Sequence, residues 1–227
     1  PDGVSMEDSK VTAILQWPAC KDASEVLSFL GLAGYYRQYI AGFARISAPL
    51  SDLLKKDQPF SWGEEQQAAF DLLKAAVTSA PVLALPDPAQ PFILKADASN
   101  RAIGAELSQE QEDGRARPIA FFSRKLSKAE QNYPTHEREL LALIAAMKNW
   151  RHYLKSNVRN QAFTDHRTLQ HFASQPNLSQ RQARWMETLQ EYHLYLDYVP
   201  GKQNVVADAL SRRPDLLAAI TTVSTLG

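Results

Sequence analysis

The chain has 227 residues, of which 44% are hydrophobic and 22% are charged, and it contains one cysteine. This composition is typical of a folded globular protein with one large domain or two small ones, and it excludes a largely disordered chain, a collagen-like repeat and a disulfide scaffold. No apolar run approaches the roughly 18 residues that a membrane-spanning helix needs, so we expect no membrane partner. The chain does not begin with methionine, and we expect it to be part of a longer protein.

The 25 basic and 25 acidic residues balance in total but are distributed unevenly. Residues 1–90 contain 7 Lys or Arg and 11 Asp or Glu, whereas residues 91–227 contain 18 and 14. The positive excess in the second part favours a polyanionic partner there, although an ordinary solvated surface fits the same numbers equally well.

Residues 1–85 are predicted to form a small all-helical domain. Apolar residues recur at helical spacing after the candidate caps Asp22 and Ser24, and again at residues 46–54 and 63–79, with no alternating strand pattern. Gly31 and Gly34 interrupt the first apolar stripe, so we expect two short helices to meet there. Three prolines between residues 80 and 88 prevent a continuing helix and place a domain boundary in that segment.

Residues 86–213 are predicted to form an α/β domain. Runs rich in Phe, Ile and Leu indicate three consecutive antiparallel strands at residues 91–97, 103–109 and 117–126. A long helix is expected to start near Pro134 and Thr135. Further strands are expected at residues 161–164 and 194–199, and further helices near residues 168–172, 179–191 and 204–212. This order indicates helices packed against one mixed sheet, and residues 214–227 remain an unassigned tail.

Four acidic residues of this domain stand at strand ends or beside apolar helix residues: Asp97, Glu139, Asp165 and Asp208. Each has an ordinary alternative explanation, namely a turn for Asp97, a helix cap for Asp165 and surface ion pairs for the other two. Because an α/β sheet brings strand ends and helix starts to one rim, the four together indicate a convergent site.

A convergent carboxylate cluster needs cations, because like charges a few ångströms apart repel strongly in a medium of low dielectric constant. Oxygen ligands suit Mg²⁺ or Mn²⁺, and two such ions about 4 Å apart can promote the hydrolysis of a phosphodiester. The sequence contains no GxxxxGK[ST], GxSxG, HExxH or CxxC motif that would indicate a different chemistry.

Several strings of the sequence resemble the reverse transcriptases of gypsy-type LTR retrotransposons. Those similar to the segment after the polymerase palm are FLGLAGYYRQYI at residues 29–40, APL at 48–50 and FSW at 60–62. Those similar to the fused ribonuclease H domain are ADAS at 96–99, FFSRKL at 121–126, YPTHERELLA at 133–142, TDH at 164–166 and ADALSR at 207–212. The resemblance covers nearly all of residues 1–213 in the order of the family.

The resemblance implies a five-stranded mixed sheet with helices on both faces, preceded by a helical thumb that grips a nucleic-acid duplex. It also implies cleavage of the RNA strand of an RNA–DNA hybrid by two Mg²⁺ or Mn²⁺ ions. The catalytic and metal-binding quartet of the family is carried over to Asp97, Glu139, Asp165 and Asp208. The spacing within the family's motif selects Glu139 over Glu137.

The sequence departs from the family in ways that affect the expected activity. It has no Tyr-x-Asp-Asp polymerase motif, so we expect no polymerisation by this chain. The loop at residues 200–204 lacks the histidine that some ribonucleases H carry, which predicts slow product release. Lys95 and Ala96 beside Asp97 are expected to alter metal affinity without abolishing it.

The expected partners are an RNA–DNA hybrid and the polymerase domain of the same polyprotein, and a dimer also remains a candidate. The candidate phosphate contacts near the inferred site are Arg101, Arg124, Lys125 and Lys128, each of which is equally compatible with a solvated surface role. We expect the protein inside the cell, either in a cytoplasmic virus-like particle or in the nucleus.

The principal alternative is a non-catalytic or domesticated module that binds nucleic acid or a protein. Retention of all four acidic residues favours the enzyme. An integrase or transposase core fits poorly, because those proteins use three acids and different flanking strings.

Overall fold

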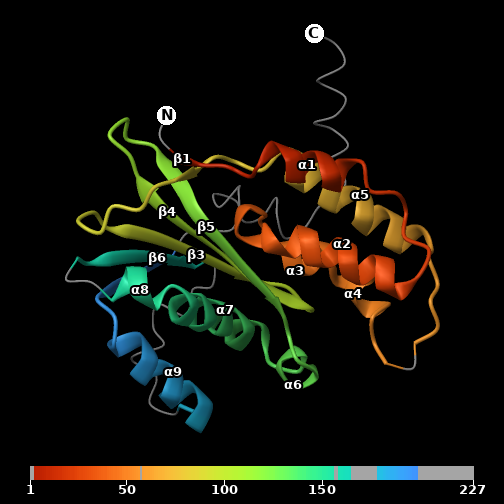
Figure 1. The fold of residues 1–227 in the computed structure, drawn as a ribbon. Coiled ribbons are helices and arrows are strands. Elements are labelled where there is room, and N and C mark those ends of the chain that lie inside the picture. Colours follow the sequence, from red (N-terminus) through yellow and green to blue (C-terminus); the bar gives the residue numbers. More distant parts are fainter. Residues whose placement is uncertain (1–2, 57, 156–157, 165–177, 199–227) are drawn as a thin grey trace.

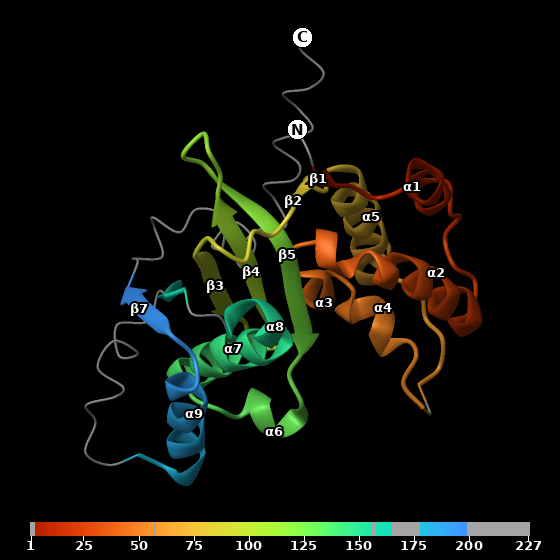
Figure 2. The same ribbon diagram turned by 60° about the vertical axis from the view of Figure 1, so that its left-hand side comes forward.

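The computed structural model describes residues 3–56, 58–155, 158–164 and 178–198, and Figures 1 and 2 show its two regions side by side. The helical region comprises α1 (Asp8–Leu15), α2 (Ala23–Tyr35), η1 (Arg37–Tyr39), α3 (Phe43–Ile46), α4 (Ala48–Asp52) and α5 (Glu64–Thr78). The second region comprises β3 (Phe92–Ala98), β4 (Ala102–Glu110), β5 (Ala116–Lys125), α6 (Lys128–Gln131), α7 (Thr135–Asn149), α8 (Arg151–Leu154), β6 (Asn160–Thr164), α9 (Gln180–Gln190) and β7 (Leu194–Tyr198). None of the helices in the described ranges is long and apolar enough to span a bilayer.

Helix α2 is continuous, which corrects the expectation of two short helices. The Asp22 side chain caps it by accepting a hydrogen bond from the Glu25 amide at 2.8 Å. A glycine inside a helix costs only about 1 kcal/mol relative to alanine, and burial of Val26 and Phe29 on the same helix outweighs this cost. The pattern of glycines was therefore a weaker signal than the apolar stripe around it.

The helical region has its own core, in which aromatic rings from different helices are in contact. Phe29 and Phe70 are almost fully buried with ring centroids 4.5 Å apart, and Trp62 packs on Phe70 at 5.6 Å. This core extends to Leu83, whereas Ala84 belongs to the core of the second region. The two cores therefore meet within the proline-containing segment.

A two-stranded ribbon that was not expected joins the ends of the helical region. Strand β1 (Gly3–Val4) pairs antiparallel with β2 (Leu83–Ala84). The expectation of a purely helical first region was wrong here, because a two-residue strand is too short to show an alternating pattern.

The second region contains the expected mixed sheet, with the strand order β5-β4-β3-β6-β7. Strands β3, β4 and β5 are antiparallel neighbours, as predicted, whereas β6 runs parallel to both β3 and β7. Helix α7 packs across β3 and β4, and α9 packs on α7. The helices predicted at residues 168–172 and 204–212 and the tail at 214–227 lie outside the described residues.

The two faces of the sheet have different neighbours. Leu94 and Ala96 of β3 are buried in the core formed with α7, whereas Asp97 faces the opposite side. Strand β5 alternates in the same way, with Phe122 in the core under α7 and Phe121 packed against the helical core. The helical region therefore contacts the sheet at β5, on the face opposite α7 (Figure 2).

Polar contacts also join the helical region to β5. The Ala44 amide donates a hydrogen bond to Ser123 Oγ at 2.9 Å. The Lys125 ammonium group donates to the Ala48 carbonyl at 3.2 Å and forms an ion pair with Asp52 at 3.1 Å. These contacts hold α3 and α4 against β5.

We predict opposite effects for two glycine-to-alanine substitutions in the helical region. Gly31→Ala should increase the free energy of unfolding by about 1 kcal/mol, because an added Cβ meets no atom within 4 Å and alanine favours the helix. Gly42→Ala should decrease it by about 1 kcal/mol, because the Gly42 φ angle of 65° is strained for alanine. Urea unfolding measures both values, and a destabilising Gly31→Ala would contradict the assignment of one continuous helix.

Candidate active site

Two of the four predicted carboxylates lie at one end of the sheet. Asp97 is half-buried near the end of β3, and Glu139 is buried in the first part of α7. The neighbour of Glu139, Arg138, donates a hydrogen bond of 2.7 Å to Asn100 Oδ1 in the turn that follows β3. The start of α7 is therefore tied to the chain three residues after Asp97.

Strand β6 ends at the same edge. Its register pairs Ile93 with Gln161 and Lys95 with Phe163 in the parallel direction, so β6 ends at Thr164 beside the end of β3. Asp165 directly follows in the sequence, but it lies outside the described residues, as does Asp208. The convergence of all four carboxylates remains a prediction.

Glu137, the competing glutamate, has a different role. Its carboxylate forms an ion pair with Arg181 at 2.9 Å and accepts a hydrogen bond from Gln182 Nε2 at 3.0 Å. The Arg181 guanidinium group also lies over the Tyr133 ring, 3.7 Å from its centroid. These contacts use Glu137 to join α7 to α9, which agrees with the choice of Glu139 as the candidate ligand.

The donor chemistry of Asp97 and Glu139 fits a hard divalent cation, because both present carboxylate oxygens. Within the described ranges, no group of three or more His, Cys, Asp or Glu side chains lies close enough to hold a metal ion. Two of the four proposed ligands fall outside those ranges, so this finding does not bear on the complete quartet.

The four predicted phosphate contacts fall into two pairs. Arg124 forms two hydrogen bonds of 2.8 Å with Glu130, and Lys125 contacts Asp52, so both are engaged within the protein. Arg101 and Lys128 are exposed. A backbone bond of 2.8 Å from Leu126 to Arg101 places the turn after β3 beside the segment that leads to Lys128.

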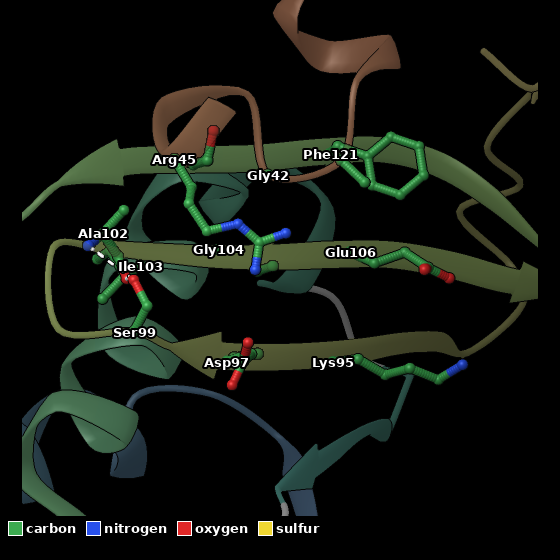
Figure 3. A pocket seen from close by; sticks show the side chains of 14 residues that line it. Gly42, Arg45, Lys95, Asp97, Ser99, Ala102, Ile103, Gly104, Glu106 and Phe121 are labelled. Atoms are coloured by element: carbon green, nitrogen blue, oxygen red, sulfur yellow. Dashed lines mark hydrogen bonds between the residues drawn. The ribbon is translucent and has the colours of Figure 1, made fainter. Parts of the chain in front are cut away.

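The sequence analysis missed one basic residue, Arg45 of α3. Figure 3 shows its side chain extending over the sheet towards Gly104, with Asp97 on the neighbouring strand. Burial lowers the pKa of the Arg45 guanidinium group, and the negative charge of Asp97 opposes this shift. The sequence carries no signal for this approach, because Arg45 precedes Asp97 by 52 positions and lies in a separately predicted domain.

Comparison with known protein families finds a match for part of the chain. Residues 62–164 match the model of the "RNase H-like domain found in reverse transcriptase". They form a domain of that family. The resemblance to retrotransposon reverse transcriptases is therefore confirmed.

The relatives over the full chain are retrotransposon polyproteins. The chain is 40% identical to the retrovirus-related Pol polyprotein from transposon opus of Drosophila melanogaster over 97% of its length. It is 39% identical to the transposon Tf2-3 polyprotein of Schizosaccharomyces pombe over 90% of its length. It spans 23% and 16% of these two polyproteins.

Solved structures support the fold. A foamy viral protease-reverse transcriptase in complex with double-stranded DNA superposes with a TM-score of 0.73 at 20% identity, covering 87% of this chain and 35% of that one. The foamy viral enzyme in complex with an RNA/DNA hybrid gives 0.69 at 19% identity, covering 92% and 28%. Because each match covers most of the chain, the combination of helical region and RNase H-like sheet occurs in these proteins too.

We predict that Glu137 contributes to stability through its contacts with α9. Glu137→Gln should lower the free energy of unfolding by about 1 kcal/mol, because it removes the charge of a buried carboxylate that pairs with the partly exposed Arg181. Arg184→Gln, which removes an exposed charge from the same helix, should have little effect. Equal stability of both variants in urea unfolding would contradict a structural role for Glu137.

We also predict a pH dependence for the Arg124–Glu130 ion pair. The hydrogen bonds from Arg124, with those from Ser127, lower the pKa of Glu130 from 4.5 to about 2. The stabilisation is therefore complete above pH 4.5 and is lost as the pH falls from 4.5 towards 2. Arg124→Gln should lower the free energy of unfolding by about 1 kcal/mol at pH 7, since the pair is partly exposed, and by less at pH 3. If Arg124→Gln lowered the free energy of unfolding by the same amount at pH 3 and at pH 7, the assignment of this ion pair would be wrong.

Proposed function

We propose that this chain cleaves the RNA strand of RNA–DNA hybrids as the ribonuclease H part of a retrotransposon polyprotein. The observation that carries the proposal is the bond between Arg138 and Asn100, which ties the helix of Glu139 to the strand end of Asp97. This arrangement occurs in a chain that is about 40% identical to Pol polyproteins. The helical region would be the thumb that precedes the nuclease domain.

The proposed site holds two Mg²⁺ or Mn²⁺ ions through Asp97, Glu139, Asp165 and Asp208. When bound, such ions activate water and stabilise the leaving oxygen of a phosphodiester. Asp165 is suited to this role because it follows Thr164 at the end of β6, next to β3. Without cations, carboxylates gathered at this end would repel one another, which supports the proposed metal dependence.

The substrate is proposed to be held through its backbone phosphates and recognised as RNA through its 2′-hydroxyl groups. Arg101 and Lys128 are the better candidates for phosphate contact, because both are exposed. Arg124 and Lys125 would have to give up their contacts with Glu130 and Asp52 before they could bind substrate.

The polymerase domain of the same polyprotein is the proposed protein partner. We place the activity inside the cell where a reverse transcriptase forms its hybrid, in a virus-like particle or in the nucleus. The foamy viral structure with an RNA/DNA hybrid, which has the same fold, is consistent with such a substrate.

We predict metal-dependent cleavage of a labelled RNA–DNA hybrid that is abolished by EDTA. Asp97→Asn and Glu139→Gln should each reduce the rate by at least about 100-fold, since even residues behind a metal ligand contribute 10–100-fold. Glu110→Gln, at the opposite end of β4, is the matched control and should cleave like the unaltered protein. Gel analysis of the labelled RNA strand measures the rates.

Two outcomes would overturn this proposal in different ways. Cleavage that persists in EDTA or in Asp97→Asn would exclude the metal mechanism. Tight hybrid binding with no cleavage in Mg²⁺ or Mn²⁺ would identify the chain as a non-catalytic binding module.

A further inference from the structure

The helical region sends one cationic side chain into the hollow beside Asp97. The hollow is lined by Gly42 and Arg45 of the helical region and by Lys95, Asp97, Ser99 and Gly104 of the sheet region. Figure 3 shows the Arg45 side chain crossing β5 and lying over β4 at Gly104. Asp97 lies on the next strand and on the same face.

The sheet carries a glycine, Gly104, beneath the Arg45 side chain (Figure 3). The register pairs Asp97 with Gly104 and Gly104 with Ser123, so these three residues form one row across β3, β4 and β5. The middle position has no side chain, and the guanidinium group lies above it in Figure 3, with no Arg45 atom within 4 Å of a Cβ built at Gly104. A Cβ at Gly104 would lie 3.7 Å from the Phe122 carbonyl oxygen, which is an ordinary contact. The backbone therefore tolerates a larger residue there, but the hollow would be filled.

The helical side of the hollow is also adapted to Arg45. A Cβ at Gly42 would lie 3.6 Å from a guanidinium nitrogen of Arg45, so the guanidinium group packs close to this glycine. The next residue but one, Ala44, is bound to Ser123 through its amide. The contact between α3 and β5 therefore holds Arg45 at a defined distance from the sheet.

The backbone amide of Arg45 donates to the Gly42 carbonyl, but the Arg45 guanidinium group forms no hydrogen bond or ion pair with any residue of the ranges that the structure describes. Four other arginines of the same ranges are bound to protein oxygens: Arg117, Arg124, Arg138 and Arg181. An arginine remains charged at any physiological pH, and its planar group binds phosphate through two parallel hydrogen bonds.

The charge of Arg45 has a consequence for a metal site at Asp97. A fixed positive charge nearby repels a divalent cation and by itself weakens its binding. An anion that contacts both the cation and the guanidinium group removes this penalty. A phosphodiester of a nucleic-acid strand is such an anion, and Lys95 on the same face adds a second positive charge.

We propose that Arg45 binds a backbone phosphate of the nucleic acid that occupies the Asp97 site, so that the helical region forms part of the nuclease site. The inference rests on the proposed function for its substrate. It predicts that phosphate recognition is shared between two regions with separate cores. This contact depends on the charge and position of the phosphate and does not distinguish base sequences.

The test measures binding of a fluorescently labelled RNA–DNA hybrid in EDTA over a series of salt concentrations. Arg45→Ala should weaken binding about tenfold, the scale of a charge-assisted hydrogen bond. It should also reduce the slope of log affinity against log salt concentration by about 0.7–0.9, as expected for one lost phosphate contact. Because the Arg45 guanidinium group forms no hydrogen bond or ion pair in the described ranges, the variant should fold normally, which circular dichroism checks.

A second variant tests the position of the guanidinium group while the charge of Arg45 is kept. Gly104→Val places a branched side chain in the hollow that Gly104 and Arg45 both line, and it should reduce affinity to a similar degree because it narrows the space beside the guanidinium group. Arg115→Ala is the matched control, since this exposed arginine lies in the turn at the far end of β4, about 20 Å from Gly104. It should bind the hybrid with unchanged affinity and slope.

The outcomes separate this inference from the proposed function. If Arg45→Ala keeps the affinity and slope of the unaltered protein, the inference is wrong even when the protein cleaves the hybrid. If Arg115→Ala loses as much affinity for the hybrid as Arg45→Ala does, a specific phosphate contact of Arg45 is excluded. If Gly104→Val binds the hybrid with unchanged affinity, a contact over β4 is excluded as well. If the protein never cleaves but Arg45→Ala and Gly104→Val lose affinity as expected, the proposed nuclease activity fails and the phosphate contact stands.

Discussion

Parallel pairing between β3 and β6 is the constraint on which the rest of this structure depends. Two parallel neighbours end at the same edge of a sheet, so the residues after both strands are brought together regardless of their distance in the sequence. The connection between them contains α7, whose start is tied by Arg138 to the turn at Asn100. One edge of one sheet thus gathers a strand end, a second strand end and a helix start.

The charges around this edge divide into ion pairs that join elements of the fold and charges that line the hollow beside β3. Glu137 and Glu130 are bound to arginines, and Lys125 is bound to Asp52 across the contact between the two regions. These pairs are satisfied without any ligand. Asp97 and Arg45 instead face the same hollow with opposite charges, at a distance at which they influence each other. That arrangement suits a site that receives a metal cation together with an anionic strand.

The contact between the helical region and β5 places a side chain of the helical region over the sheet. Phe121 joins the helical core, while its neighbour Phe122 faces the core under α7, so one strand belongs to both cores. Because close-packed interiors resist small displacements, packing β5 into both cores restricts movement of α3 relative to the sheet. Arg45 reaches the row of Asp97 and Gly104 for this reason.

Local patterns in the sequence were sufficient for most elements. Strands rich in Phe, Ile and Leu and an amphipathic helix after Thr135 were located to within one or two residues, because their periodicity reflects burial directly. The resemblance to gypsy-type reverse transcriptases supplied the choice of Glu139, which periodicity alone could not distinguish from Glu137. The short ribbon of β1 and β2 and the continuity of α2 through Gly31 depended on tertiary packing, and local propensity misjudged them.

The sequence by itself determined the order of the elements, the mixed sheet and the identity of the candidate carboxylates, because these follow from periodicity and from motifs that lie within short stretches. Only the tertiary structure decided which charges are already paired and which meet at the site. Ion pairs such as that of Lys125 with Asp52, and the approach of Arg45 to Asp97, join residues 52 or more positions apart. No local pattern encodes such pairs, since their geometry exists only once the two cores have packed against β5.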